Sequence, residues 1–454
     1  MRQRFKPYSD YEESGVAWIG DMPSHWGLQR TKTFFNRMQR PVRPKDGIVT
    51  AFRDGEVTLR SNRRTDGFTN AAKEIGYQGV RVDDLVVHAM DGFAGAIGVS
   101  DSDGKCSPVY SVCTPKEKNN VHVAYYGYLV RQLAVTDFIN SLAKGIRERS
   151  TEFRYSEFSI LRLAVPPIEE QKQIASFLDY ETGKIDALIA MQQQLIALLG
   201  EKRQAVISHA VTKGLNPDAP MRDSGVQWLG QVPEHWKALP LKYLCGLLKD
   251  GTHLPPPRVS EGVPLLSVRN IQNGKFSFRN DDSQISEASY SDLCRAFVPA
   301  TDDVFMAIVG ATLGKVAVVP KMDRFHIQRS LAILRTKKEL MLSRYLAGVL
   351  SSQGFQDLLW ENVGFSAQPG IYLGTIENFR VPVPPVEEQL AICGELDRKS
   401  ETMDVLIDKA VRSVELLRER RTALISAAVT GKIDVRGWKP PSADPKQQTE
   451  MEVA

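Results

Sequence analysis

Residues 14–26 read SGVAWIGDMPSHW, and residues 224–236 read SGVQWLGQVPEHW. Eight of the thirteen positions are identical, and the two stretches are 210 residues apart. We call this stretch the Trp motif. A period of more than 200 residues is too long for a solenoid repeat. The repetition therefore predicts two copies of a whole domain in one chain.

Two further pairs of segments recur at an offset of 218 residues. The helix-start motif VPPIEEQ at 165–171 returns as VPPVEEQ at 383–389. The helix-end motif AVISHAVT at 205–212 returns as ALISAAVT at 423–430. Between the shared segments the two halves look unrelated. One repeated frame with divergent contents suggests a single scaffold that carries two different binding domains.

The two later motifs enclose a long predicted helix in each half. Residues 168–212 contain no proline, and Pro166 and Pro167 stand just before them. Glu169 and Glu170 fall in the first turn, where carboxylates stabilise the positive end of the helix dipole, and Gly214 follows as a stop. The same marks predict a second helix over 386–430. Each helix would be roughly 65 Å long.

Apolar residues along both helices alternate at spacings of three and four, which predicts a coiled-coil seam. Because a small domain cannot cover so long a stripe, the most economical partner of each helix is the other helix, in antiparallel orientation. The alternative is that each helix folds back on its own domain. The predicted seam and docking positions are Ile174, Leu178, Ile185, Leu188, Leu195, Leu199, Val206, Leu396, Leu406, Val414 and Leu417.

The segment before each helix shows short β-branched runs between turn residues, which indicates mixed α/β structure. The predicted fold is α+β: two mixed α/β domains separated by two long antiparallel coiled-coil helices, with a pseudo-two-fold internal repeat. The expected divisions are a first domain at 1–167, a central helix at 168–213, a second domain at 214–385, a C-terminal helix at 386–433 and a disordered tail at 434–454.

Bulk composition limits the class of protein. No run of 18 uncharged apolar residues appears, so a membrane span is not expected. The five cysteines form no CxxC pair, which argues against a structural zinc site and favours the reducing cytoplasm. The net charge is only +4, but residues 30–64 hold ten Lys or Arg against three Asp or Glu. Residues 237–279 hold seven against two. Basic stretches at matching places attract polyanions.

The usual catalytic motifs are missing from the sequence. Residues 310–316 resemble a phosphate loop, but only three residues separate the glycines and Val316 stands where Ser or Thr must reach magnesium. The seven histidines show no metal-ligand spacing, so no metal site is expected. His25 and His235 belong to the Trp motif, where repetition beside tryptophan suggests a packing role. We therefore expect no catalytic residues in this chain.

The layout resembles the specificity subunit of type I restriction–modification enzymes, over essentially the whole chain to about residue 436. The three paired motifs carry this resemblance. Four segments of the second half are also typical of the family: KDGTH at 249–253, EGVPLLSVRN at 261–270, GATLGK at 310–315 and QRS at 328–330. The first half matches less clearly, as expected for a family whose target-recognition domains vary.

The resemblance implies a non-catalytic, cytoplasmic subunit. It implies two target-recognition domains that each read half of a split, asymmetric site in double-stranded DNA. It also implies docking of two modification subunits and of restriction subunits. S-adenosylmethionine, ATP and magnesium would be bound by those partners, with no cofactor in this chain. The alternatives are a stand-alone nucleic-acid enzyme such as a nuclease, and a coiled-coil scaffold that binds proteins.

Sequence-specific reading of a duplex needs side chains that make paired hydrogen bonds to base edges, whereas phosphate contacts only position the protein. The basic stretches supply the candidates for both kinds of contact. The predicted DNA-contacting residues are Arg53, Arg60, Arg63 and Arg64 in the first half, and Lys249, Arg258, Arg269, Lys275 and Arg279 in the second.

Overall fold

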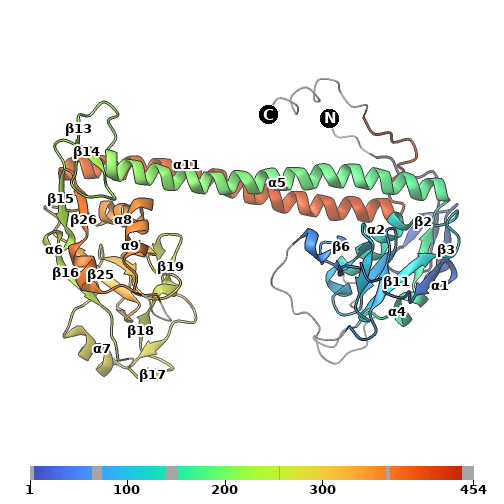
Figure 1. Ribbon diagram of the computed structural model, residues 1–454, viewed down its shortest axis with the longest axis horizontal. Helices are drawn as coiled ribbons and strands as arrows, with labels where there is room; N and C mark the ends of the chain where they lie inside the picture. The colour runs from blue at the N-terminus through green and yellow to red at the C-terminus, as the bar shows by residue number, and fades with distance from the viewer. Residues whose placement is uncertain are drawn as a thin grey trace. The chain divides into compact units, whose positions relative to one another are not determined.

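The computed structural model describes residues 5–63, 74–136, 138, 152–254, 256–364 and 369–441. The chain divides into two compact units (Figure 1). Unit 1 consists of Met1–Gln192 and Arg412–Ala454, and unit 2 of Gln193–Val411. Each unit combines sheets, short helices and a part of both long helices, which confirms the mixed α and β composition and the presence of two long helices.

The Trp motif forms the same hairpin in each unit. In unit 1, β1 (Tyr11–Glu13) pairs antiparallel with β2 (Asp21–Pro23). In unit 2, β13 (Met221–Asp223) pairs with β14 (Gln231–Pro233) in the same register, 210 residues later. Gly20 and Gly230 have φ angles of 65° and 58°. Only glycine adopts this left-handed region without strain, which explains why these glycines recur.

The centre of unit 1 is an antiparallel four-stranded sheet in the order β4-β11-β8-β9. The first strand after the Trp motif, β3 (Gly27–Arg30), pairs with β12 (Arg162–Val165) just before the first long helix. The other elements are α1 (Thr31–Phe34), β4 (Phe35–Met38), β5 (Val49–Ala51), β6 (Val57–Leu59), η1 (Arg60–Asn62), β7 (Gln78–Val80), β8 (Leu85–His88), η2 (Gly92–Ala94), β9 (Ile97–Val99), β10 (Gly104–Cys106), β11 (Tyr110–Pro115), α2 (Val123–Val135) and α4 (Tyr155–Ile160).

Unit 2 is built around a six-stranded sheet in the order β16-β25-β22-β23-β20-β19, with a smaller sheet β17-β21-β18-β24. Here β15 (Lys237–Pro240) pairs with β26 (Arg380–Val383) before the second long helix. The other elements are α6 (Leu241–Leu244), β16 (Cys245–Asp250), β17 (Arg258–Val259), β18 (Val263–Leu266), η3 (Val268–Asn270), β19 (Ile271–Gln272), β20 (Lys275–Phe276), β21 (Gln284–Ile285), α7 (Glu287–Cys294), β22 (Val304–Ala307), β23 (Val316–Val318), β24 (His326–Ile327), β25 (Leu331–Thr336), α8 (Ser343–Ser351), α9 (Gln353–Glu361) and α10 (Leu373–Asn378).

The central strand of each sheet contributes to two cores. Successive side chains of a strand point to opposite faces. On β8, Leu85 and Val87 belong to the core that includes α2, whereas Val86 belongs to a second core on the other face. On β22, Val304 and Met306 pack in one core and Phe305 in another. Both sheets are therefore buried on both faces, which holds the loops at their ends in place.

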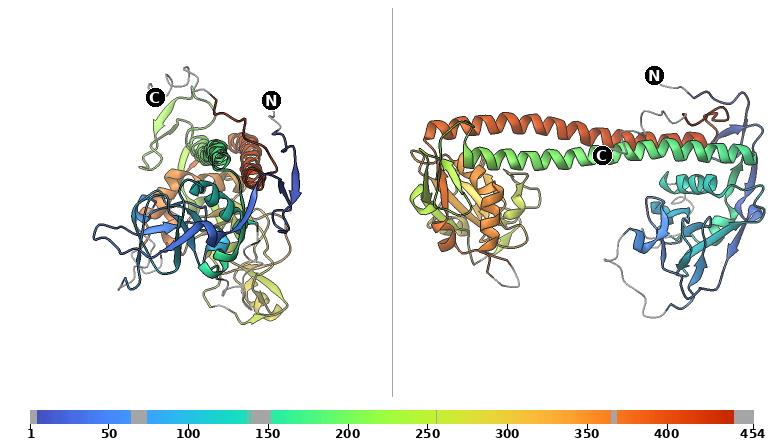
Figure 2. Two further views of the ribbon diagram at one scale, coloured as in Figure 1. Left: turned by 90° about the vertical axis from the view of Figure 1, so that its right-hand side faces the viewer. Right: turned by 45° about the horizontal axis from the view of Figure 1, so that its top comes forward.

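The two long helices are α5 (Ile168–Lys213) and α11 (Val386–Val429). They lie side by side in both views of Figure 2. In unit 1, Arg421 donates to Asp186 at 2.9 Å, while Gln173 donates to the Trp438 carbonyl beyond the end of α11. In unit 2, Arg203 pairs with Asp404. Asp186 follows Gln173 on α5, whereas its partner Arg421 precedes Trp438, the partner of Gln173. The two chain segments therefore run antiparallel within unit 1.

The residues buried along the long helices match the predicted seam at most positions but not at all of them. Ile174, Leu178, Ile185, Leu199 and Val414 are buried, and Val206, Leu396 and Leu417 are partly buried. Leu188, Leu195 and Leu406 are 42–44% exposed, so their assignment to the helix–helix seam is wrong.

On α5 the partly buried residues are instead Ile189 and Ile196, one position further along the chain. One residue turns the side chain by about 100° around an α-helix. The predicted pattern therefore placed Leu188 and Leu195 in the seam, whereas they lie on a neighbouring face of α5. That face remains exposed in this chain.

The first part of the predicted disordered tail is ordered, so that prediction is wrong for residues 434–438. Trp438 packs edge-on against Phe177 with ring centroids 5.4 Å apart, and Val435 is 1% exposed. Apolar contacts of Val435 and Trp438 hold this segment against the core of unit 1. Residues 442–454 lie outside the described part of the chain.

Candidate nucleic-acid interface

The three repeated motifs meet in each unit. In unit 1 the buried carboxylate of Glu170 accepts hydrogen bonds from Tyr8 and from Trp26 Nε1 at 2.9 Å, and lies 2.9 Å from His25 Nε2. In unit 2 Glu388 accepts from Trp236 Nε1 at 3.0 Å. The second glutamate of each helix-start motif therefore fixes the Trp motif to the start of a long helix.

The glutamine that follows each of these glutamates has an equally matched role. Gln171 accepts from the His122 N–H at 2.8 Å and donates to the Pro166 carbonyl at 2.8 Å. Gln389 accepts from the Leu342 N–H at 2.8 Å and donates to the Pro384 carbonyl at 2.9 Å. Each glutamine satisfies buried backbone groups where a helix begins.

The helix-end motifs complete these junctions. The end of α5 packs in unit 2, and the end of α11 packs in unit 1. Tyr345 on α8 donates to the Val211 carbonyl at the end of α5, at 2.9 Å. Tyr125 on α2 donates to the Val429 carbonyl at the end of α11, at 3.2 Å. Burial raises the pKa of both phenols well above the usual value, so they remain donors. The repeated residues thus form a structural frame, and His25 and His235 belong to it.

The predicted DNA-contacting arginines of unit 1 are largely engaged within the chain. Arg53 pairs with Asp91 at 2.7 Å, and Arg63 pairs with Asp54 at 2.7 Å. Arg60 donates to the Thr50 hydroxyl at 3.3 Å. Arg64 lies outside the described residues. Exposed pairs of this kind contribute little to stability, but each must be broken or shared before its arginine contacts a phosphate.

The unit 2 candidates fall into two groups. Arg269 and Arg279 both bind Asp281, each at 3.0 Å. The hydrogen bond from Arg279 holds the pKa of the Asp281 carboxyl below its usual value. Lys249 donates to the Ala296 carbonyl at 3.2 Å. Among the described residues, Arg258 and Lys275 have no side-chain partner, and both are exposed. These two are the available cations of the predicted set.

Loops at one end of the six-stranded sheet gather three of the family-typical segments. β16 and β22 end where β25 begins, as the pairs Asp250↔Ala332 and Ala307↔Leu331 show. The KDGTH, GATLGK and QRS segments continue from these strand ends. We call residues 251–254, 308–310, 328–330 and 369–372 the loop edge of unit 2. Its side chains include Arg329, which is exposed and was not among the predicted contacts.

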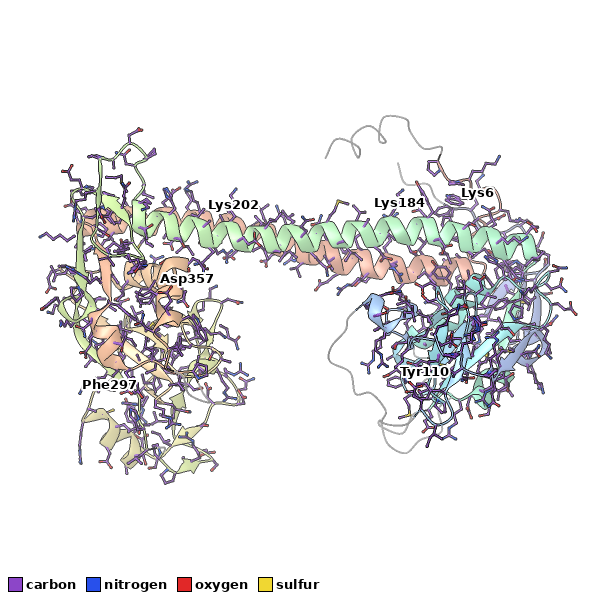
Figure 3. The ribbon with its side chains drawn as sticks, in the orientation of Figure 1. Lys6, Tyr110, Lys184, Lys202, Phe297 and Asp357 are labelled. Carbon is purple, nitrogen blue, oxygen red and sulfur yellow. The ribbon has the colours of Figure 1, made fainter. Side chains whose placement is uncertain are left out.

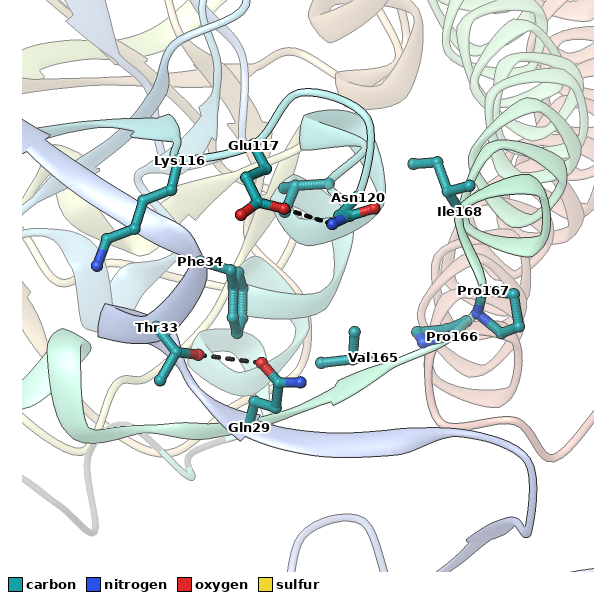
Figure 4. A pocket seen from close by; sticks show the side chains of 11 residues that line it. Gln29, Thr33, Phe34, Lys116, Glu117, Asn120, Val165, Pro166, Pro167 and Ile168 are labelled. Carbon is teal, nitrogen blue, oxygen red and sulfur yellow. Dashed lines mark hydrogen bonds between the residues drawn. The ribbon is translucent and has the colours of Figure 1, made fainter.

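Two cavities lie among the described residues of unit 1. One, of about 580 Å³, lies at the equivalent end of the four-stranded sheet and is lined in part by Arg37, Met90, Pro108 and Arg154. The other, of about 410 Å³, lies beside the first helix-start motif (Figure 4). There Lys116 and Glu117 are neighbours of opposite charge, and Glu117 accepts from Asn120 at 2.6 Å. Neither lining resembles a catalytic cluster.

The described residues contain no group of three or more His, Cys, Asp or Glu side chains placed to hold a metal ion. Within the same residues, every helix is too short or too polar to cross a membrane. Many charged side chains cover both units and the long helices instead, among them Lys184 and Lys202 on α5 (Figure 3).

Comparisons with known proteins agree with this geometry. Residues 233–406 match the family model of the type I restriction modification DNA specificity domain. The chain is 26% identical over 327 residues to the putative type I restriction enzyme MjaX specificity subunit of Methanocaldococcus jannaschii, covering 70% of each chain. The chain is therefore similar to type I specificity subunits over most of its length. It is also 25% identical over 412 residues to the EcoBI specificity subunit of Escherichia coli, covering 88% of this chain and 83% of that one.

The fold is similar to that of a chain in a solved structure of a type I restriction–modification system. The TM-score is 0.68 at 16% identity, over 90% of this chain and 98% of the other. Specificity subunits are the non-catalytic members of their enzymes. The matched relatives are named as specificity subunits, which agrees with the prediction of a non-catalytic chain.

Proposed function

We propose that this chain is the DNA-reading specificity subunit of a type I restriction–modification complex and recognises an asymmetric target in two parts. The observation that carries the proposal is the matched frame in the two units. The Glu170 and Glu388 junctions fix equivalent hairpins to helix starts. The sheets attached to them differ, with four strands in one unit and six in the other. Two different readers on one frame suit two different half-sites.

The available cations support binding to duplex DNA. Arg258 lies on β17, in a strand whose two residues are both exposed. Lys275 is exposed on β20, next to the turn at Asn273 and Gly274. Phosphate contacts from such side chains position a protein on DNA without reading its sequence. In this proposal Arg258 and Lys275 hold unit 2 against the DNA phosphates, while other side chains read the bases.

The exposed face of α5 supports docking of partner subunits. Leu188, Met191, Leu195 and Leu198 are 42–55% exposed at spacings of three and four residues. Contiguous exposed apolar residues at helical spacing mark protein interaction surfaces. We propose that two modification subunits dock on the long helices and that restriction subunits join them in the cytoplasm. Those partners would bring S-adenosylmethionine, ATP and magnesium, with no cofactor bound by this chain.

Replacing both available cations should weaken the salt dependence of DNA binding. Each phosphate contact releases about one counterion, so Arg258→Ala with Lys275→Ala should lower the slope of log K against log salt by about 2. The measurement is a salt titration of target-duplex binding by the complex of this chain with modification subunits. A matched control is Arg295→Ala, because Arg295 is 83% exposed just after the end of α7 and, among the described residues, pairs only with Asp292.

An unchanged slope in the double variant would remove Arg258 and Lys275 from the interface. If the unaltered complex showed no salt-dependent binding to duplex DNA, the proposed function itself would be contradicted. That second outcome would favour a coiled-coil scaffold that binds proteins.

A further inference from the structure

The loop edge of unit 2 has a rigid backbone. The Arg329 N–H donates to the Thr252 carbonyl at 3.2 Å, and the Gln328 N–H donates to the Leu266 carbonyl at 2.9 Å. Thr252 and Gln328 also form an isolated parallel bridge. A β-carbon on Gly251 would collide with the Gln328 carbonyl. This close approach requires glycine and fixes the loop that carries Arg329 against its neighbour.

The Arg329 side chain, by contrast, is free. It is exposed, and no described residue binds its guanidinium. Arg269 and Arg279 in the same unit share Asp281 and must give up ion pairs before they contact DNA. Because Arg329 has no such partner, contact with a ligand would cost it only the loss of hydration and rotamer freedom. A free guanidinium on a fixed backbone suits bidentate recognition of an acceptor pair.

Unit 1 has the same backbone arrangement at the corresponding place. The Ile308 N–H donates to the Ser330 carbonyl at 3.0 Å, as the Ala89 N–H donates to the Val109 carbonyl at 2.9 Å. The Leu331 and Tyr110 N–H groups each close the preceding turn, to Gln328 at 3.1 Å and to Ser107 at 3.2 Å.

By this correspondence the equivalent of Arg329 is Pro108, which lines the larger cavity of unit 1. A further matched bond extends the correspondence. Ile371 donates to the Ile308 carbonyl at 3.0 Å, and Phe153 donates to the Ala89 carbonyl at 2.8 Å. The next residues are Tyr372, which is 83% exposed, and Arg154. The backbone frame is kept while the exposed side chains change, which is expected of positions that set specificity.

We propose that the loop edge of unit 2 reads bases in the major groove and that Arg329 contacts a guanine of the half-site bound by this unit. This rests on the proposed function and names the residue that reads. The O6 and N7 atoms of guanine form the acceptor pair that fits an arginine fork. The cations of the basic stretches, Arg258 and Lys275 among them, then serve the phosphate backbone.

The test uses the complex of this chain with modification subunits, and it measures methylation across a library of duplexes in which each target position is randomised. Arg329→Ala should lower methylation of the preferred site about 10-fold or more, as expected for loss of one bidentate pair. It should relax preference at one base pair in one half-site and leave the other half unchanged. Arg329→Lys should show the same relaxation, because lysine keeps the charge but loses the fork. Arg295→Ala is the control and should change nothing.

Two outcomes would overturn this inference. If Arg329→Lys restores full activity and Arg329→Ala weakens all sites equally, Arg329 is a phosphate contact. If both variants methylate the same sites at the unaltered rate, Arg329 lies outside the interface. Either outcome leaves the proposed function intact, provided that the unaltered complex methylates a two-part target. If the unaltered complex methylates no such target, the proposed function fails.

Discussion

Replacing Trp236 with alanine should destabilise unit 2 by about 3–5 kcal/mol, the range found for deletion of a large aromatic side chain from a core. Trp236 is 1% exposed and lies in the main core of the unit. Its indole N–H donates to Glu388 at 3.0 Å, so the variant also leaves that carboxylate with one donor fewer. Hydrogen exchange of the amides of β15, β26 and the start of α11 should become at least about 100-fold faster.

Trp360→Ala is the matched control, because this tryptophan of unit 2 is 46% exposed on α9. Its removal should cost less than about 1 kcal/mol, as is usual for surface positions. We therefore expect faster amide exchange in β15 and β26 in Trp236→Ala than in Trp360→Ala. Equal protection in both would mean that the Trp motif does not hold the unit together, and the explanation of the repeated motifs would be wrong.

Removing one heptad from both long helices should change the spacing of the two-part DNA target or abolish methylation. The segments 196–202 and 405–411 both lie in unit 2, immediately beyond the Arg203–Asp404 ion pair. Their joint deletion keeps the antiparallel register and shortens each helix by about 10.5 Å. That length corresponds to about three base pairs of DNA.

The expected result is a gap shortened by about three base pairs, or no methylation where the changed phase of the duplex prevents binding. Deleting 196–202 alone is the comparison, because it shifts the seam out of register and should impair folding of the helix pair. Methylome sequencing of cells that carry each variant measures both outcomes. Methylation at the original gap and rate in the double deletion would show that helix length does not set the spacing.

The boundaries of the long helices could be predicted from the sequence almost to the residue. The predicted spans 168–212 and 386–430 correspond to α5 (Ile168–Lys213) and α11 (Val386–Val429). The signals are local: two prolines and two glutamates at each start, and glycines just beyond each end. Gly214 and Gly431 have φ angles of 77° and 73°, as a helix stop requires. Such features act through the backbone, so they need no tertiary information.

The sequence could not predict which face of α5 is buried against α11, nor which cationic side chains lack a partner. Leu188 and Ile189 are equally apolar, and only the position of the partner helix decides which one is buried. Likewise Arg269 and Arg258 look alike in the sequence, but Asp281 binds only the first. Arg329 lay outside the predicted basic stretches. The surroundings of Arg329 are formed by loops that are far apart in sequence, so its lack of a partner among the described residues could not be read from the sequence.

In the proposed function, two different DNA-reading domains on one repeated frame recognise two different half-sites. Methylome sequencing of cells that express this chain with its modification subunits tests it most directly. We expect one methylated motif with two unlike half-sites separated by a fixed gap of unspecified bases. A single continuous palindrome methylated by this system would contradict it.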